Sequence, residues 1–292
     1  MKRWKGAALV KSIQTENLSL TLKAEVNEHN HDGSFNIDFK WDPADLTFAD
    51  LLESGGVVPL PPYIHRQTVN DDSVRYQTVY ATCDGSVAAP TAGLHFTNEM
   101  LSQVKQHGHI YAKVTLHIGV GTFRPVTAET IAGHAMHSEK ILVSKKTIQT
   151  ILNNSSRPII AVGTTSARTV ESLYWIGNKI LSGKEHPFEV GQWDPYAQES
   201  FPSTIESLNA LQSYMTRNHL EEVSGETRLL IMPGYKFKII TALVTNFHMP
   251  QSTLLLLVAA MVGGGWREAY DFALNSGFRF LSYGDSCLFF KR

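Results

Sequence analysis

The chain has 292 residues, of which 43% are hydrophobic and 18% charged, and its formal net charge is -1. This composition is typical of a globular protein that buries a core of its own, and the length favours two domains. A net charge this close to zero excludes a protein that coats nucleic acid through bulk charge. It does not exclude a local basic patch on the surface.

Cysteine usage and hydropathy bound the class of protein further. Cys83 and Cys287 form no C-x-x-C pair and no zinc spacing, so we interpret them as reduced thiols. The first residues carry no apolar segment of the kind a signal peptide has, and the longest apolar run, residues 254–262, has half the length of a membrane span. We therefore expect a cytoplasmic protein with no membrane segment and no metal.

The first part of the chain alternates apolar and polar residues in short runs, as strands do. Strands are expected at residues 7–10, 18–22 and 35–39, a short helix at 45–54 and a proline-rich linker at 59–63. The pattern predicts a small antiparallel, β-barrel-like domain over residues 1–72.

From residue 73 onward, short apolar strands are followed by amphipathic helices. Strands are expected at 110–117, 158–162, 237–244, 278–282 and 286–290, and helices at 97–107, 144–153, 165–173, 252–261 and 266–275. This alternation predicts a layered α/β main domain over residues 73–292. Residues 177–225 are interpreted as a partly irregular insertion that includes a helix near 203–219.

Two glycine-containing stretches combine close backbone approach with polar side chains. In residues 89–97, Thr91, Gly93 and His95 form a turn that runs into a helix, which suits a ligand site or a capping turn with a structural histidine. After the strand ending near 117, Gly119, Gly121 and Thr122 suit a nucleoside or a simple β-bend. No helix opens directly after them, so a dinucleotide site is disfavoured.

Two further stretches offer acid–base or anion-binding groups. His137 and Glu139 point to one face if they lie on a strand, as a general acid–base pair or as a plain surface strand. Thr164 and Thr165 follow a buried strand and open a helix, where hydroxyl and N–H groups bind carboxylates or phosphates. Arg168 and Glu171 have the spacing of an ion pair on one helix face.

The last two stretches lie near the C-terminus. Asn246 and His248 come where a strand ends, and Asp285 follows a glycine as a bound carboxylate or as part of an Asx-type turn. No metal site is expected, because His29 and His31 look like part of a solvated turn and the chain lacks the H-E-x-x-H motif.

Each of these motifs is weak alone, but together and in this order they resemble the S-adenosylmethionine:tRNA ribosyltransferase-isomerase family of queuosine biosynthesis. The matching strings are Ala-Pro-Thr-Ala-Gly-Leu-His-Phe-Thr, Gly-Thr-Phe-Arg-Pro-Val, Met-His-Ser-Glu, Val-Gly-Thr-Thr-Ser, Thr-Asn-Phe-His-Met-Pro-Gln-Ser-Thr-Leu and Arg-Phe-Leu-Ser-Tyr-Gly-Asp. The resemblance covers residues 57–176 and 226–290. A Val-Asn-Asp-Thr-Arg-like motif, usual in an N-terminal segment of the family, is missing, so a truncated or divergent member is expected.

The resemblance implies a reaction that needs no cofactor, with S-adenosylmethionine as a consumed substrate and tRNA as partner. The ribosyl part moves onto 7-aminomethyl-7-deazaguanine in tRNA and isomerises, giving epoxyqueuosine-tRNA, adenine and methionine. Candidate acid–base residues are His95, His137, Glu139 and His248. Candidate substrate-binding residues are Thr91, Gly93, Gly119, Gly121, Thr122, Thr164, Thr165, Asn246 and Asp285, and candidate phosphate contacts are Arg66, Arg75, Lys113 and Arg124.

Two other function classes stay open at this point. One is a catalytically inactive relative that binds tRNA or S-adenosylmethionine without turnover, which the missing motif favours. The other is a hydrolase that cleaves S-adenosylmethionine with water in place of the tRNA amine. A methyltransferase is disfavoured, because no strand–G-x-G–helix unit with a later acidic residue is present.

Overall fold

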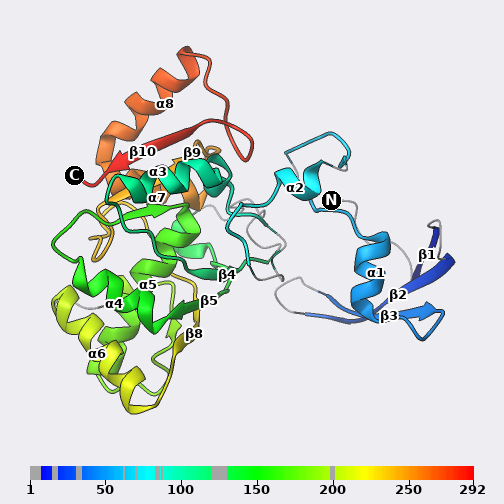
Figure 1. Ribbon diagram of the computed structural model, residues 1–292, viewed down its shortest axis with the longest axis horizontal. Helices are drawn as coiled ribbons and strands as arrows, with labels where there is room; N and C mark the ends of the chain where they lie inside the picture. Colours follow the sequence, from blue (N-terminus) through cyan, green and yellow to red (C-terminus); the bar gives the residue numbers. More distant parts are fainter. Residues whose placement is uncertain are drawn as a thin grey trace. The chain divides into compact units, whose positions relative to one another are not determined.

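The structure is a computed structural model that describes residues 8–14, 19–30, 35–61, 63–69, 71–82, 86, 88–119, 130–197 and 201–292. Its contacts divide the chain into two compact units, Met1–Ser73 and Val74–Arg292 (Figure 1).

The described part of the N-terminal unit is an antiparallel meander followed by a helix. Strands β1 (Ala8–Gln14), β2 (Ser19–His29) and β3 (Phe35–Asp42) pair in the order β1-β2-β3. Helix α1 (Phe48–Gly55) begins with a capping box between Thr47 and Asp50, and its Leu51 is buried. The expected barrel-like closure is not seen, since the described strands of this unit form an open sheet with β1 and β3 as its edges. The short helix α2 (Asp72–Arg75) lies at the boundary.

The larger unit is a mixed α/β structure whose described strands form two sheets. In the first, β6 (Ile160–Val162) runs parallel to β9 (Ala242–Asn246), and β10 (Ser286–Phe290) is antiparallel on the other side of β9. In the second, β4 (Thr115–His117), β5 (Glu139–Ser144), β8 (Glu222–Thr227) and β7 (Glu189–Val190) follow in that order. In the second sheet β7 runs parallel to β8, and β5 is antiparallel to both β4 and β8. Two of the predicted motifs follow the parallel strands β6 and β9 of the first sheet.

Helices surround these sheets, and side-chain caps fix where several of them start. The α-helices are α3 (Asn98–Gln106), α4 (Lys145–Asn153), α5 (Thr164–Leu181), α6 (Thr204–Arg217), α7 (Thr253–Val262) and α8 (Trp266–Asn275). The 3-10 turns are η1 (Thr91–His95), η3 (Ile131–Gly133), η4 (Asp194–Tyr196) and η5 (Gly263–Gly265). Thr97, Ser144 and Ser252 cap α3, α4 and α7 as predicted, because each hydroxyl accepts an orphan N–H of the first turn.

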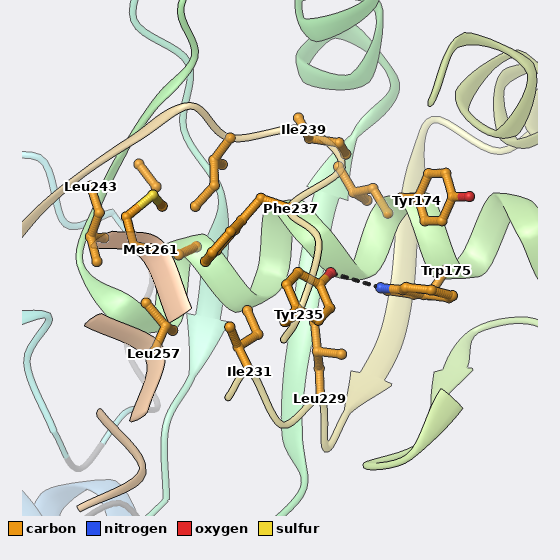
Figure 2. Packing of buried hydrophobic residues seen from close by; sticks show 14 of the residues in the cluster. Tyr174, Trp175, Leu229, Ile231, Tyr235, Phe237, Ile239, Leu243, Leu257 and Met261 are labelled. Carbon is orange, nitrogen blue, oxygen red and sulfur yellow. Dashed lines mark hydrogen bonds between the residues drawn. The ribbon is translucent and has the colours of Figure 1, made fainter. Parts of the chain in front are cut away.

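Helix α5 is the centre of the hydrophobic core. Tyr174 and Trp175 lie at one end of the buried group in Figure 2, and Leu243, Leu257 and Met261 lie at the other. The region 177–225 is built into this core rather than lying outside it, since Leu208, Leu211 and Met215 of α6 are fully buried and β8 pairs with β5. Buried α7 holds the apolar run at 254–262, and no helix in the described part of the chain is long and apolar enough to cross a membrane.

Three predicted strands differ from the structure, and hydrogen bonding explains each difference. Residues 237–241 are not a strand, because the N–H groups of Lys238, Ile239 and Ile240 donate to the Glu171 carboxylate. Residues 278–282 form turns, in which the N–H of Arg279 donates to Asp285. The strand predicted at 110–117 shortens to β4, because its partner β5 ends at the cap of α4.

Candidate active site

Three predicted motifs meet where the parallel strands β6 and β9 end. The paired strands stop at Val162 and at Asn246, and the next residue after β6, Gly163, begins α5. A Cβ on Gly163 would lie 3.9 Å from the Cβ of Ala92, so η1 lies directly beside this strand end. The carboxyl ends of parallel strands are where open α/β sheets bind ligands. Residues 91–95, 163–165 and 246, which are far apart in the sequence, therefore form one surface.

Asn246 links this strand end to His95. The Asn246 side chain is 2% exposed, and its Nδ2 donates to His95 Nε2 at 3.3 Å and to the carbonyl oxygen of Gly284 at 3.4 Å. Because Nε2 accepts, the neutral His95 ring carries its proton on Nδ1. Asn246 Oδ1 is buried without a hydrogen-bond partner among the residues that the structure describes. Such an acceptor suits a ligand hydroxyl or amine.

Packing explains why position 93 is a glycine, which the sequence alone did not reveal. A Cβ at this position would collide with the hydroxyl of Tyr80 and with the methyl group of Thr78. Burial raises the pKa of Tyr80, so this hydroxyl keeps its proton. The close approach that Gly93 allows is therefore to Tyr80, and neither Tyr80 nor Thr78 lies in a motif that sequence patterning would select.

A second polar cluster consists of His137, Glu139 and Arg168. His137 Nε2 lies 2.9 Å from Glu139 Oε1, and Arg168 Nη1 lies 3.2 Å from Glu139 Oε2. Glu139 is 1% exposed and Arg168 5%, whereas the side chain of His137 is 29% exposed. Burial by itself would raise the pKa of Glu139, but Arg168 and His137 offset it and hold that pKa below its usual value. Glu139 is thus a carboxylate that holds a more accessible imidazole.

The two clusters share helix α5. Thr164 opens this helix and Arg168 follows it by four residues, which is a rise of about 6 Å along the axis. The expected ion pair between Arg168 and Glu171 is wrong, because Arg168 contacts Glu139 while Glu171 accepts bonds from the segment 235–240. The available signal was a charged residue soon after the buried strand and its Gly-Thr-Thr turn, since a charged residue near a core is seldom buried without a partner.

His248 lies apart from His95 and Asn246. Its Nε2 is 2.8 Å from the hydroxyl of Thr245, and its backbone N–H donates to the Tyr270 hydroxyl. Thr245 and Asn246 are successive residues of β9, so their side chains point to opposite faces. Burial lowers the pKa of His248 to about 4. The imidazole is therefore neutral near pH 7, and the geometry fits a residue that fixes the strand end.

We expect His248 to make folding stability depend on pH between about 4 and 6.5. In that window the unfolded chain binds a proton at this imidazole that the folded chain does not, so the free energy of unfolding falls as pH falls. The loss is about 3 kcal/mol at pH 4. Urea unfolding of the wild type and of His248→Gln across this range measures it. An equal pH dependence in the two proteins would contradict the assignment.

Asp285 closes a turn. Its Oδ2 accepts from the N–H of Arg279 at 2.7 Å and its Oδ1 from Arg279 Nη2 at 2.9 Å. These bonds from Arg279 lower the pKa of Asp285. The carboxylate thus ties the loop back to Arg279, six residues earlier, whereas an Asx-type turn would use an N–H two residues further on. A role for Asp285 toward substrate stays a prediction.

Three of the remaining predicted residues lie at or next to β4, η1 and α5, and others lie outside the described part of the chain. Gly119 is exposed just after β4, and Thr91 and Thr165 are half-buried at the starts of η1 and α5. Gly121, Thr122, Arg124, Cys83 and His31 lie outside the described residues. The described residues contain no group of three or more His, Cys, Asp or Glu side chains that could hold a metal ion. Burial raises the pKa of Cys287 to about 12, so its thiol is unreactive.

The predicted phosphate contacts differ in their surroundings. The guanidinium of Arg66 is not free to bind a phosphate, because it makes a bidentate ion pair with buried Asp72. Arg75 is exposed and lies 5.7 Å from the centroid of the Tyr283 ring. Lys113 is exposed, with its Nζ 3.4 Å from the carbonyl oxygen of Tyr80. Arg75 and Lys113 are therefore the better candidates for contacts to nucleic acid.

Gly163 is expected to tolerate no side chain. Its φ of +92° and ψ of 145° are a conformation that residues with a Cβ rarely adopt. Gly163→Ala should lower the free energy of unfolding by about 1–3 kcal/mol. Thermal or urea unfolding measures the change. Gly264→Ala is the matched control, because a Cβ there meets nothing within 4 Å. Equal losses in both variants would show that the Gly163 backbone is not strained by a side chain.

The fold and the site define a mixed α/β protein with a polar site at the ends of two parallel strands. The model of the family described as queuosine biosynthesis protein matches residues 2–289. The chain therefore belongs to this family.

Two named relatives agree with the family, and one solved structure stands beside them for comparison. The chain is 40% identical over 244 residues to S-adenosylmethionine:tRNA ribosyltransferase-isomerase of Trichlorobacter lovleyi, covering 82% of this chain and 60% of that protein. It is 42% identical over 242 residues to the protein of the same name from Treponema denticola, covering 82% and 58%. A crystal structure of S-adenosylmethionine tRNA ribosyltransferase from Thermotoga maritima is 27% identical, with a TM-score of 0.44, and the match covers 92% of this chain and 64% of that one. The chain thus spans about three fifths of the length of these curated relatives.

Proposed function

We propose that this chain transfers and isomerises the ribosyl part of S-adenosylmethionine onto 7-aminomethyl-7-deazaguanine in tRNA. The products are epoxyqueuosine-tRNA, adenine and methionine. Family membership and the names of two relatives at 40% and 42% identity support this proposal. The single observation that carries the chemistry is the buried Glu139 carboxylate, which holds a partly exposed His137 at 2.9 Å.

His137 is the proposed base. The sulfonium of S-adenosylmethionine acidifies the adjacent ribose carbon, so a positioned imidazole can remove a proton there. Glu139 accepts the Nε2–H of His137, which puts the basic lone pair on Nδ1 and stabilises the imidazolium that forms. The ion pair with Arg168 keeps Glu139 ionised for this task.

The strand-end surface is the proposed place of the adenosine. His95 would donate from Nδ1 to the departing adenine, since its Nε2 already accepts from Asn246. Asn246 Oδ1 and the Thr164 hydroxyl would bind the polar groups of the ribose. Arg75 and Lys113 are the proposed contacts to tRNA phosphates, and binding of tRNA should then weaken steeply with added salt.

The experiment that tests the function is adenine release from S-adenosylmethionine, with and without tRNA that carries the aminomethyl-deazaguanine base. Release only with that tRNA is the expected result. Release without tRNA would indicate a hydrolase instead. Binding of either ligand with no release would indicate an inactive relative, and both of these outcomes contradict the proposal.

A further inference from the structure

The guanidinium of Arg168 has two donor nitrogens with no hydrogen-bond partner among the described residues. Its side chain is 5% exposed and contacts Glu139 through Nη1. Its Nε and Nη2 are buried and have no hydrogen-bond partner within the described part of the chain. A buried charged donor without an acceptor is costly, so native proteins keep such groups where a ligand or an ordered water completes them.

The two open donors lie on one edge of the guanidinium. Nε–H and one N–H of Nη2 are parallel and form a fork, while Nη1 lies on the other side toward Glu139. This fork matches the spacing of the two oxygens of a carboxylate or phosphate, which bind Arg in a bidentate way. The geometry therefore favours an anion with two acceptor oxygens over a single hydroxyl group.

The start of helix α5 points to the same chemistry. This helix has 18 residues, and its N-cap Gly163 supplies no side-chain hydrogen bond to the first turn. The first N–H groups and the helix dipole favour an anion there. Side chains of a helix lean toward its N-terminus, which brings Arg168 back toward this first turn.

The burial of Glu139 and Arg168 favours a small-molecule anion over a phosphate of tRNA. Glu139 and Arg168 are among the least exposed charged residues of the chain, at 1% and 5%. The phosphates of tRNA stay on the outside of the nucleic acid and reach exposed cations most easily. A small-molecule carboxylate fits the buried fork better than a tRNA phosphate does.

We infer that the Nε/Nη2 edge of Arg168 binds the α-carboxylate of the methionine part of S-adenosylmethionine, with the first turn of α5 beside it. This inference rests on the proposed function and adds the group that fixes the substrate's orientation. The carboxylate would be held about one helical turn from Thr164, and His137 would share Glu139 with the same arginine.

The test compares S-adenosylmethionine with decarboxylated S-adenosylmethionine, which differs from it by the carboxylate alone. Calorimetric binding to the wild-type chain should favour S-adenosylmethionine by about 10- to 100-fold. Arg168→Gln should bind the two ligands nearly equally. Arg217→Gln, at an exposed position in the last turn of α6, should keep the wild-type preference.

The comparison of the two ligands on the wild-type chain tests the inference even if Arg168→Gln fails to fold, because this comparison needs no substitution. Equal affinity of the wild type for both ligands, with adenine still released, would overturn the inference and leave the proposed function standing. An unchanged preference in folded Arg168→Gln, with weaker tRNA binding, would overturn it in favour of a tRNA phosphate. Binding of neither ligand would overturn both the inference and the function.

Discussion

Replacing His137 by alanine is expected to lower the rate of tRNA-dependent adenine release by about 100- to 10,000-fold, the usual contribution of a general base. The side chain is 29% exposed and precedes β5, so its removal leaves the core intact. Single-turnover rates at saturating substrate measure the chemical step. Circular dichroism and urea unfolding measured alongside should match the wild type.

Two variants separate the base from general effects on the protein. Glu139→Gln keeps a side chain of the same shape beside His137 but leaves the buried Arg168 without a counter-charge. This variant should therefore show both a lower rate of adenine release and a lower free energy of unfolding. His107→Ala is the matched control, because this exposed histidine lies at the end of α3 with its Nδ1 2.8 Å from the backbone carbonyl oxygen of Gln103. A wild-type rate in His137→Ala would remove His137 from the mechanism.

The second large effect is expected at Glu171, whose carboxylate is fully buried in the core. It accepts the hydroxyl of Tyr235 at 2.7 Å and three backbone N–H groups from residues 238–240 at 2.8, 2.8 and 2.9 Å. Glu171→Ala leaves four donors unsatisfied and opens a cavity, so the free energy of unfolding should fall by about 3–5 kcal/mol. Equilibrium unfolding in urea measures this loss.

The isosteric variant and an exposed glutamate test the explanation. Glu171→Gln keeps one acceptor oxygen but turns an amide NH₂ toward N–H donors, so it should lose less than the alanine variant. Glu268→Gln, at an exposed position of α8, should change stability by about 0.5 kcal/mol or less. A loss below about 1 kcal/mol in Glu171→Ala would show that water replaces the carboxylate.

Local signals in the sequence determined most helices and the motifs. Thr97, Ser144 and Ser252 were identifiable as caps, because a cap depends on hydrogen bonds within three residues along the chain. Helix α8 runs from Trp266 to Asn275 as predicted for the same reason, since its apolar face follows the helical period. The match to the family likewise came from short strings that need no tertiary information.

Only the tertiary structure decided which of these motifs act together. The ion pair joins Glu139 to Arg168, 29 positions later in the chain, and the hydrogen bond joins His95 to Asn246, 151 positions later. The strand predicted at 237–244 begins only at Ala242 in the structure, because backbone N–H groups of the preceding residues donate to distant Glu171. Such partners are set by how distant segments pack, and period and propensity report only on neighbours along the chain. The sequence by itself thus determined helix starts and family, and packing alone decided that a buried arginine, a carboxylate and a histidine form one cluster.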